Sequence, residues 1–375
     1  MIYFDNAATT KIDKDVLDTY IKIQNNFFAN TTSLHKLGQE ANFMFNKAKA
    51  ELLQALKLKN HDVVFVSNAT EANNLGIYGI VSGKKGKVIT TKVEHPSVSE
   101  IFKDLENKGY EVVYLNVDEH GIIDLNELKN SIDSNTLLVS IMWVNNIIGT
   151  IEPIGEVIEI VKKYPKCKLH VDSVQGLCKV KETFDLNDVD MFTFSTHKIY
   201  GPKGIGCLIL KNNIDLDKVL YGSFGQKGIK PGTLDLALAC ATTKAIKKFY
   251  PETQKHFEYV KKLNERLISK IKDNPKIIIN SPYQIKEYLP YIVNISIPEV
   301  NGETVVHALE ANEIYVSTGS SCSSKLKKPE KTVYAISNDE KRATTSIRIS
   351  FSYLNQISEV DKLVDCLNEI TKISK

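Results

Sequence analysis

Apolar residues follow two spacings along most of the chain, and the two spacings alternate. From 35 to 58 they recur every three or four positions, which is typical of one face of a helix, whereas 62–66 is a short apolar run of strand length. The predicted strands are 62–66, 87–90, 111–115, 137–143, 168–172, 190–195 and 206–210, and the predicted helices between them are 35–58, 70–80, 97–107 and 154–164. This alternation predicts an α/β fold with a mainly parallel sheet covered by helices on both faces.

The pattern changes after residue 251. A long charged helix is predicted at 253–271, and shorter elements follow it. These are strands at 276–279, 292–297 and 346–350, a helix at 302–310, a polar loop at 317–328 and a final helix. We therefore expect a large α/β domain over 15–252 and a small α+β domain made of 1–14 and 253–375.

Composition narrows the class of protein. The 375 residues are 42% hydrophobic and 25% charged, as in ordinary globular proteins, and the net charge is only +3. No concentrated basic stretch is present, which argues against direct nucleic-acid binding. No apolar run approaches the ~20 residues of a membrane span, and the first residues lack a basic leader followed by an apolar core. We expect neither a membrane partner nor a signal peptide.

The six cysteines show no paired spacing, which argues against a disulfide framework or a structural metal site and favours a reducing cytoplasm. A free cysteine is usually a small buried residue, and Cys207 within an apolar run fits that description. Cys322 does not, because it lies in a loop of small polar residues close to several lysines. Such a thiol can have more thiolate character, and a functional role and a structural one both stay open.

Polar residues follow many of the predicted strands. Asp172 ends one strand and Lys198 comes just after the next, and open parallel sheets bind ligands at this edge. One explanation is that Asp172 and Lys198 form an ordinary ion pair. The other is a pyridoxal phosphate site, in which the lysine forms a Schiff base and the aspartate pairs with the ring nitrogen.

Other strand ends supply further candidates, each with an ordinary alternative. Thr70 begins a helix whose first turn could cradle a phosphate or simply be capped. His95, Asn146 and Gln175 also follow strands, where they could contact a planar cofactor or be satisfied locally. Arg348 alternates with apolar residues in a late strand, so it could face solvent or clamp a substrate carboxylate.

Taken together, these motifs resemble the cysteine desulfurases, in the class V branch of fold-type I pyridoxal phosphate enzymes, over nearly the whole chain. The resemblance is carried by YFDNAATT at 3–10, ATE at 69–71 with Asn73 and Asn74, HVD at 170–172 with Gln175, Ser195 with HKIYGPKG at 197–204, and GSSC at 319–322.

The resemblance implies a role for each matching residue. Lys198 would carry the Schiff base and move the Cα proton, His95 would stack on the ring and help in proton transfer, and Cys322 would be the nucleophile. Arg348 and Asn6 would bind the substrate. The implied cofactor contacts are Ala69, Thr70, His95, Asn146, Asp172, Gln175, Ser195, His197, Lys198 and Thr233. Thr233 would reach the phosphate of a partner subunit, which implies a homodimer, and no metal is implied.

The implied reaction removes sulfur from L-cysteine, giving L-alanine and a persulfide on Cys322. A sulfur-acceptor protein of iron–sulfur cluster assembly or tRNA thiolation would then take the sulfur. Selenocysteine lysis, another class V reaction or a weakly active scaffold are alternatives, the last because 221–232 is poorer in glycine and arginine than in the family. Asn68 replaces a usual glycine, which we attribute to its tolerance of left-handed backbone angles.

Overall fold

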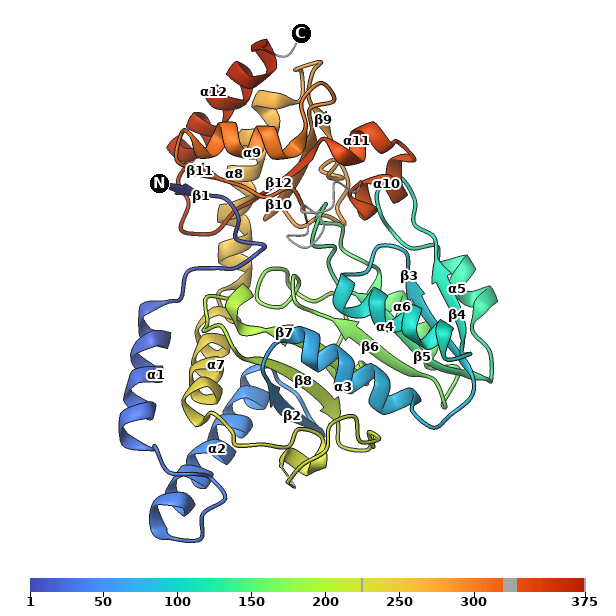
Figure 1. Ribbon diagram of the computed structural model, residues 1–375, viewed down its shortest axis with the longest axis vertical. Coiled ribbons are helices and arrows are strands. Elements are labelled where there is room, and N and C mark those ends of the chain that lie inside the picture. Colours follow the sequence, from blue (N-terminus) through green and yellow to red (C-terminus); the bar gives the residue numbers. More distant parts are fainter. Residues whose placement is uncertain (224, 320–328, 374–375) are drawn as a thin grey trace.

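A computed structural model describes residues 1–223, 225–319 and 329–373. Its larger part is built on a seven-stranded sheet, and a smaller α+β part lies above it in Figure 1. The strands of the large sheet are β2 (His61–Val66), β3 (Lys87–Thr91), β4 (Glu111–Leu115), β5 (Thr136–Met142), β6 (Lys168–Asp172), β7 (Met191–Ser195) and β8 (Gly206–Lys211). Their order is β2-β8-β7-β6-β5-β3-β4. Only β8 is antiparallel to its neighbours, so the prediction of a mainly parallel sheet is confirmed.

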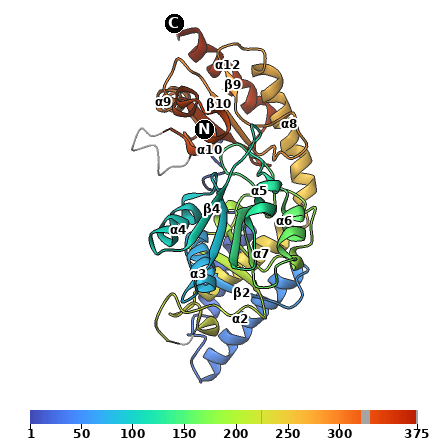
Figure 2. The same cartoon turned by 90° about the vertical axis from the view of Figure 1, so that its right-hand side faces the viewer.

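Successive side chains of each strand point to opposite faces of the sheet, and both faces are buried except along the edge strand β4. Val64 and Leu208 pack toward α3 (Ala69–Val81) and α4 (Pro96–Asn107), whereas Val63 and Ile209 belong to the core cluster on the other side. In Figure 2, α3 and α4 lie on one side of the sheet and α6 (Ile154–Val161) on the other. Burial on both faces explains why the strands are continuous apolar runs rather than alternating ones.

The hydrophobic periodicity of the sequence does not predict every helix of the larger part. The predicted helix at 35–58 is α2 (Lys36–Ala55), whereas α1 (Lys14–Asn26) is not predicted, although Val16, Tyr20 and Ile23 recur at helical spacing on its packed face. Helix α7 (Leu236–Phe249) is buried on nearly all sides, and most of its buried residues are alanines and threonines. A helix without a distinct polar face gives no clear period. The short helices α5 (Leu125–Ser131), η1 (Leu186–Asp188), η2 (Thr196–Lys198) and η3 (Gln226–Gly228) complete this part.

The smaller part contains an antiparallel sheet in the order β12-β10-β9 and a parallel pair, β1 with β11. Its strands are β1 (Ile2–Tyr3), β9 (Ile278–Ile279), β10 (Ile292–Ser296), β11 (Ile314–Tyr315) and β12 (Ser346–Ser350), and its helices are α8 (Thr253–Ile271), α9 (Gly302–Glu310), α10 (Lys331–Ser337), α11 (Glu340–Thr344) and α12 (Ile357–Ile373). An additional α+β lobe is thereby confirmed. The boundary at 252 stays a prediction. No helix of the described ranges is long and apolar enough to cross a membrane.

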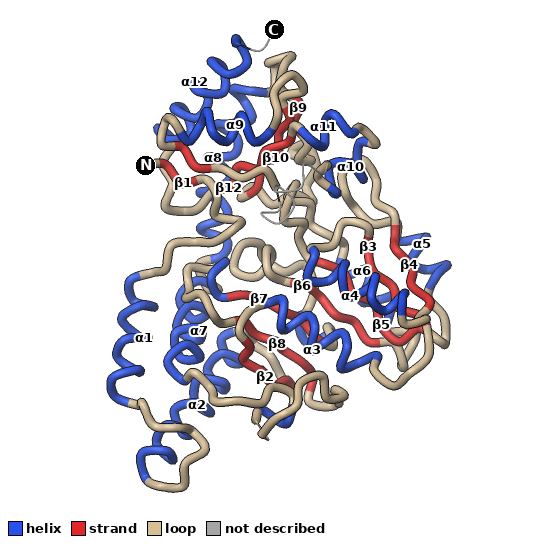
Figure 3. The backbone as a smooth tube through the Cα atoms, viewed as in Figure 1, coloured by secondary structure: helices blue, strands red, loops and turns tan. Residues whose placement is uncertain are grey.

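The first residues of the chain connect the two parts. In Figure 3 they run as a loop from β1 in the smaller part down to α1 in the larger one. On the way, the backbone N–H of Ala7 donates to Ser350 Oγ at 2.8 Å, and the Thr10 hydroxyl donates to the carbonyl of His197 at 2.9 Å. The loop is thus bonded both to the end of β12 and to the turn after β7, which places it beside the edge of the large sheet.

Candidate active site

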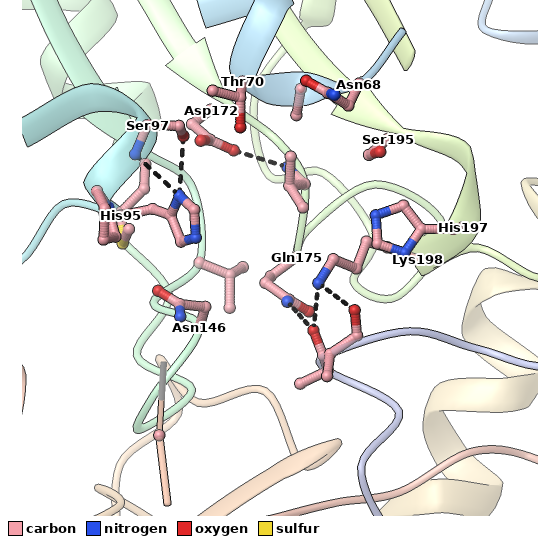
Figure 4. Close-up of a pocket in the computed structure, with 18 of the residues that line it drawn as sticks. Asn68, Thr70, His95, Ser97, Asn146, Asp172, Gln175, Ser195, His197 and Lys198 are labelled. Atoms are coloured by element: carbon pink, nitrogen blue, oxygen red, sulfur yellow. Dashed lines mark hydrogen bonds between the residues drawn. The ribbon is translucent and has the colours of Figure 1, made fainter. Parts of the chain in front are cut away.

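The polar residues that follow the strands meet in one pocket at the carboxyl edge of the sheet (Figure 4). The pocket has about 940 Å³ of empty space, part of which is open to solvent. Ten of the predicted residues line it: Ala69, Thr70, His95, Asn146, Asp172, Gln175, Ser195, His197, Lys198 and Arg348. The convergence expected from the sheet topology is therefore observed.

Two other predicted residues, Asn6 and Thr233, do not line this pocket. Asn6 donates from Nδ2 to the carbonyls of Tyr3 and Ser350, at 3.1 and 3.0 Å, and is not part of the lining. Thr233 is exposed and lies in a separate hollow. Cys322 lies outside the described residues, although Gly319, three positions before it, lines the pocket.

One end of the pocket is suited to an anion. Ala69 and Thr70 form the first turn of α3, where backbone N–H groups have no helical acceptor. Ser195 Oγ is buried and has no hydrogen-bond partner among the described residues. Gly206 leaves room for this turn, since a Cβ there would lie 2.7 Å from the carbonyl carbon of Asn68. Free donors and a helix N-terminus are what a phosphate group requires.

Asn68 has a different role from the one inferred from the sequence. Its φ is −172°, an extended angle that any residue adopts, so the explanation by left-handed tolerance is wrong. Instead, Asn68 is the N-cap of α3, and its Oδ1 accepts from the N–H of Glu71 at 2.9 Å. The side chain thus stabilises the helix that presents the free N–H groups.

A chain of hydrogen bonds connects Asp172 to His95 across the pocket. Asn73 Nδ2 donates to Asp172 Oδ2 at 3.1 Å and to Ser97 Oγ at 2.9 Å. His95 Nδ1 accepts from the N–H of Ser97 at 3.1 Å and lies 2.8 Å from its hydroxyl. Because Nδ1 is an acceptor, the proton of the neutral ring is on Nε2. Burial lowers the pKa of His95, which favours this neutral form.

The contribution of Ser97 was not foreseen, because a serine in the first turn of a helix usually indicates only a cap. Asn73 was noted as part of the resemblance but without a role. Its side chain is buried beneath the pocket, where Thr193 donates to Asn73 Oδ1 at 2.6 Å. Its burial, which the sequence does not show, is what marks its role, since a buried amide needs hydrogen-bond partners.

Lys198 does not form an ion pair with Asp172, so the ordinary explanation for the two residues does not hold. Its Nζ donates instead to the carbonyls of Ala7 and Ala8, at 2.6 and 2.7 Å. Burial, with a smaller contribution from Arg348, lowers the pKa of Lys198 to about 8. About a tenth of the amine is therefore unprotonated, and hence nucleophilic, at pH 7, far more than for a lysine of ordinary pKa.

Arg348 comes from the middle of β12 and is only 3% exposed, so the solvent-facing alternative is wrong. One terminal nitrogen donates to Asp5 Oδ1 at 3.1 Å and the other to the carbonyl of Asn146 at 2.9 Å. Its Nε has no partner among the described residues. Arg348 is among the residues that line the pocket, and each terminal nitrogen keeps a second N–H, so the planar guanidinium could still bind a carboxylate.

His197 is held by the same N-terminal loop, since its Nδ1 lies 3.1 Å from Thr9 Oγ1. Burial, helped by Lys198 and Lys179, lowers the pKa of His197 to about 4, so the ring is neutral at physiological pH. Near the hollow that contains Thr233, Lys230 Nζ lies 2.6 Å from Glu71 Oε1. The divergent stretch before Thr233 is thereby bonded to the first turn of α3.

The sheet, the anion-binding turn and the buried amine define an α/β protein of the aminotransferase type. The family model "Aminotransferase class-V" matches residues 2–363, and the chain belongs to this family. Its relatives there include a "NifS/IcsS protein homolog" of Lactobacillus delbrueckii subsp. bulgaricus, 37% identical over 99% of this chain and 97% of that protein. A "Cysteine desulfurase IscS" of Clostridium botulinum is 33% identical over 99% of this chain and 94% of its own length.

The fold is similarly shared with solved structures. A "NifS-like protein" superimposes with a TM-score of 0.90 at 32% identity, over 99% of both chains. The resemblance to the cysteine desulfurases that the motifs indicated is confirmed by these relatives, and so is the predicted fold class.

Proposed function

We propose that this protein is a pyridoxal phosphate-dependent cysteine desulfurase, which converts L-cysteine into L-alanine and a protein-bound persulfide. The observation that carries the proposal is the joint placement of Lys198, Asp172 and the anion-binding turn around one pocket. The names of the relatives support the substrate, because proteins 33% identical over nearly the full length are called cysteine desulfurases.

The pocket residues fit the cofactor on their chemistry. The free N–H groups of Ala69 and Thr70 and the unpartnered hydroxyl of Ser195 would hold the phosphate, with His197 beside them. Asp172 would keep a proton on the ring nitrogen. Bound pyridoxal phosphate supplies an aldehyde that captures amino groups and a ring that withdraws electrons from the captured substrate.

The protein's own groups would bind and orient the amino acid. Arg348 would take the carboxylate with its fork of N–H donors, as Arg does wherever planar anions are recognised. Lys198, with its lowered pKa, can accept a proton from Cα and return it. His95 presents Nε2–H, since its other nitrogen is occupied by Ser97.

Sulfur transfer requires a nucleophile, and we propose Cys322, three positions after Gly319 in the sequence. Its thiolate would attack the substrate sulfur. A sulfur–sulfur bond forms, the Cβ–S bond breaks, and the electron pair of that bond stays on carbon, which takes up a proton to give alanine. The persulfide would then be passed to a thiol of an acceptor protein in iron–sulfur cluster assembly or tRNA thiolation.

A homodimer is part of the proposal. Large apolar side chains lie exposed on α2 and in the segment between α1 and α2, among them Phe28 at 73%, Leu34 at 91% and Phe43 at 69%. Such a group of residues favours a protein interface. Thr233, exposed on one copy, would reach the phosphate site of the other. The described cysteines are all unpaired, which supports a reducing compartment, and we propose the cytoplasm.

The experiment measures alanine and protein-bound persulfide after L-cysteine is added to the purified, cofactor-loaded protein without another thiol. We expect both products, and we expect Cys322→Ala to lose both while Cys366→Ala keeps them. Absence of alanine from the unaltered protein would support the weakly active scaffold instead. Undiminished alanine formation by Cys322→Ala would exclude this thiol as the sulfur acceptor.

A further inference from the structure

A second buried amine lies close to Lys198. The side chain of Lys179 is 5% exposed, and among the described residues it forms no ion pair with a carboxylate. The groups that interact with it electrostatically are Lys198, Arg348, His197 and the buried thiol of Cys178, none of which is an anion at neutral pH. Burying an amine without an acid destabilises a protein, so this residue calls for an explanation.

Among the described residues, the side-chain amine of Lys179 is bonded to a residue of the pocket. Its Nζ donates to Gln175 Oε1 at 2.6 Å. An amine that is a donor holds the oxygen end of the amide and leaves the nitrogen end free to point elsewhere. Gln175 Nε2 accordingly points to the carbonyl of Ala7, at 2.9 Å, the same oxygen to which Lys198 Nζ donates. The NH₂ group of Gln175 is thus aligned beside the amine of Lys198.

We propose that Lys179 is a positioning residue, which fixes the amide of Gln175 so that its N–H groups, and not its oxygen, face the bound cofactor. The inference rests on the proposed cofactor. The ring of pyridoxal phosphate carries an oxygen that is readily anionic, next to the carbon that a lysine attacks. A donor beside that oxygen stabilises the anion, whereas a flipped amide would place its own oxygen there and repel it.

The chemistry of the site explains why an amine serves here and an apolar residue does not. Burial, with a smaller effect of Lys198, lowers the pKa of Lys179 to about 7. Methionine would fill the same space without the cost of desolvating a charge. A purely structural residue would therefore be replaceable by methionine, but only a donor can hold Gln175 Oε1.

The test titrates the visible absorbance of the cofactor-loaded protein with pH. The visible band is lost when the bound cofactor loses a proton as the pH rises, and the ring oxygen is then an anion. A donor beside this oxygen stabilises the deprotonated state and so lowers the pH at which half of the band is lost. We expect Lys179→Met to raise this midpoint by about 1 pH unit. We expect Lys179→Arg to restore most of the shift and the exposed neighbour Lys181→Met to show none. The melting temperature of cofactor-free Lys179→Met should stay within about 3 °C of the parent.

The same substitution made in a Gln175→Met variant distinguishes positioning of Gln175 by Lys179 from a direct effect of the Lys179 charge on the cofactor. If Lys179 acts through Gln175, adding Lys179→Met to Gln175→Met should shift the midpoint by less than a third as much as it does alone. A full shift in that background would overturn the inference, and so would an unchanged midpoint in Lys179→Met. Absence of a visible band in the unaltered protein would instead contradict the proposed function itself.

Discussion

Two cations reach the pocket from different sheets, and one N-terminal loop holds them both in different ways. Lys198, from the turn after β7, donates to the neutral carbonyls of Ala7 and Ala8. Arg348, from β12, donates to the carboxylate of Asp5. Carbonyls give the lysine acceptors without a negative charge, so burial keeps its pKa near 8 and it can lose a proton. The carboxylate stabilises the guanidinium, which stays charged as a carboxylate clamp requires.

The largest effect should come from removing the lysine. We expect Lys198→Ala to lose the visible absorbance band of the cofactor and to reduce alanine formation by about 10³-fold or more, since both the covalent link and the proton transfer depend on this amine. The exposed Lys203→Ala is the matched control and should behave as the parent. If Lys198→Ala still formed alanine, the reaction would not depend on this lysine.

The arginine should affect substrate binding and not the cofactor. We expect Arg348→Lys, which keeps the charge but loses the planar fork, to raise the KM for cysteine by about 10- to 100-fold with an unchanged visible band. Steady-state kinetics and absorbance spectra check this prediction. A normal KM would show that Arg348 serves only its partners Asp5 and Asn146.

A pH dependence follows from the low pKa of Lys198. The rate at which the cofactor-free protein captures pyridoxal phosphate should rise with pH and level off above about pH 8, as the amine loses its proton. The folded amine titrates below its unfolded value of 10.5, so the unfolded chain binds more protons in between. This group therefore makes the cofactor-free protein more stable as the pH rises from about 8 to 10.5.

The variant Asp5→Asn tests that assignment. The negative charge of Asp5 raises the pKa of Lys198, so its removal should move the midpoint of the capture rate to lower pH. An unmoved midpoint would show that a group other than Lys198 controls the profile.

The smallest effect concerns the turn that presents the phosphate donors. Asn68→Ala removes the N-cap of α3 and should cost about 1 kcal/mol of unfolding free energy, measured by urea denaturation, whereas Asn68→Gly should cost only a few tenths. Glycine would stabilise the protein only if Asn68 had a strained backbone. A more stable Asn68→Gly would therefore contradict the extended angle described above.

The sheet edge could be predicted from the sequence because its geometry follows from topology. Buried strands are apolar runs, parallel strands end at the same edge, and so Asp172, His95 and Lys198 could be placed together without coordinates. The resemblance to cysteine desulfurases added roles, of which the family and fold are confirmed, while the individual site residues stay predictions. Ten of the predicted site residues line a single pocket, which makes a shared role testable by the variants above.

What the sequence did not provide are contacts between distant segments. Nothing in the pattern around Arg348 says that it is buried against Asp5, since a charged residue in an alternating strand usually faces solvent. Nor does a lysine seven residues after Asp172 indicate a buried amine bonded to Gln175. These relations depend on how the N-terminal loop and the smaller part pack against the sheet edge, over separations of up to 343 residues.

The central claim, that Lys198 is the group that captures the cofactor, can be tested most directly by chemical trapping. The protein is incubated with pyridoxal phosphate, reduced with borohydride, digested and analysed by mass spectrometry. We predict a single pyridoxyl-modified peptide that contains Lys198. Modification of Lys179, the other buried amine with a lowered pKa, or of no pocket lysine at all, would contradict the account.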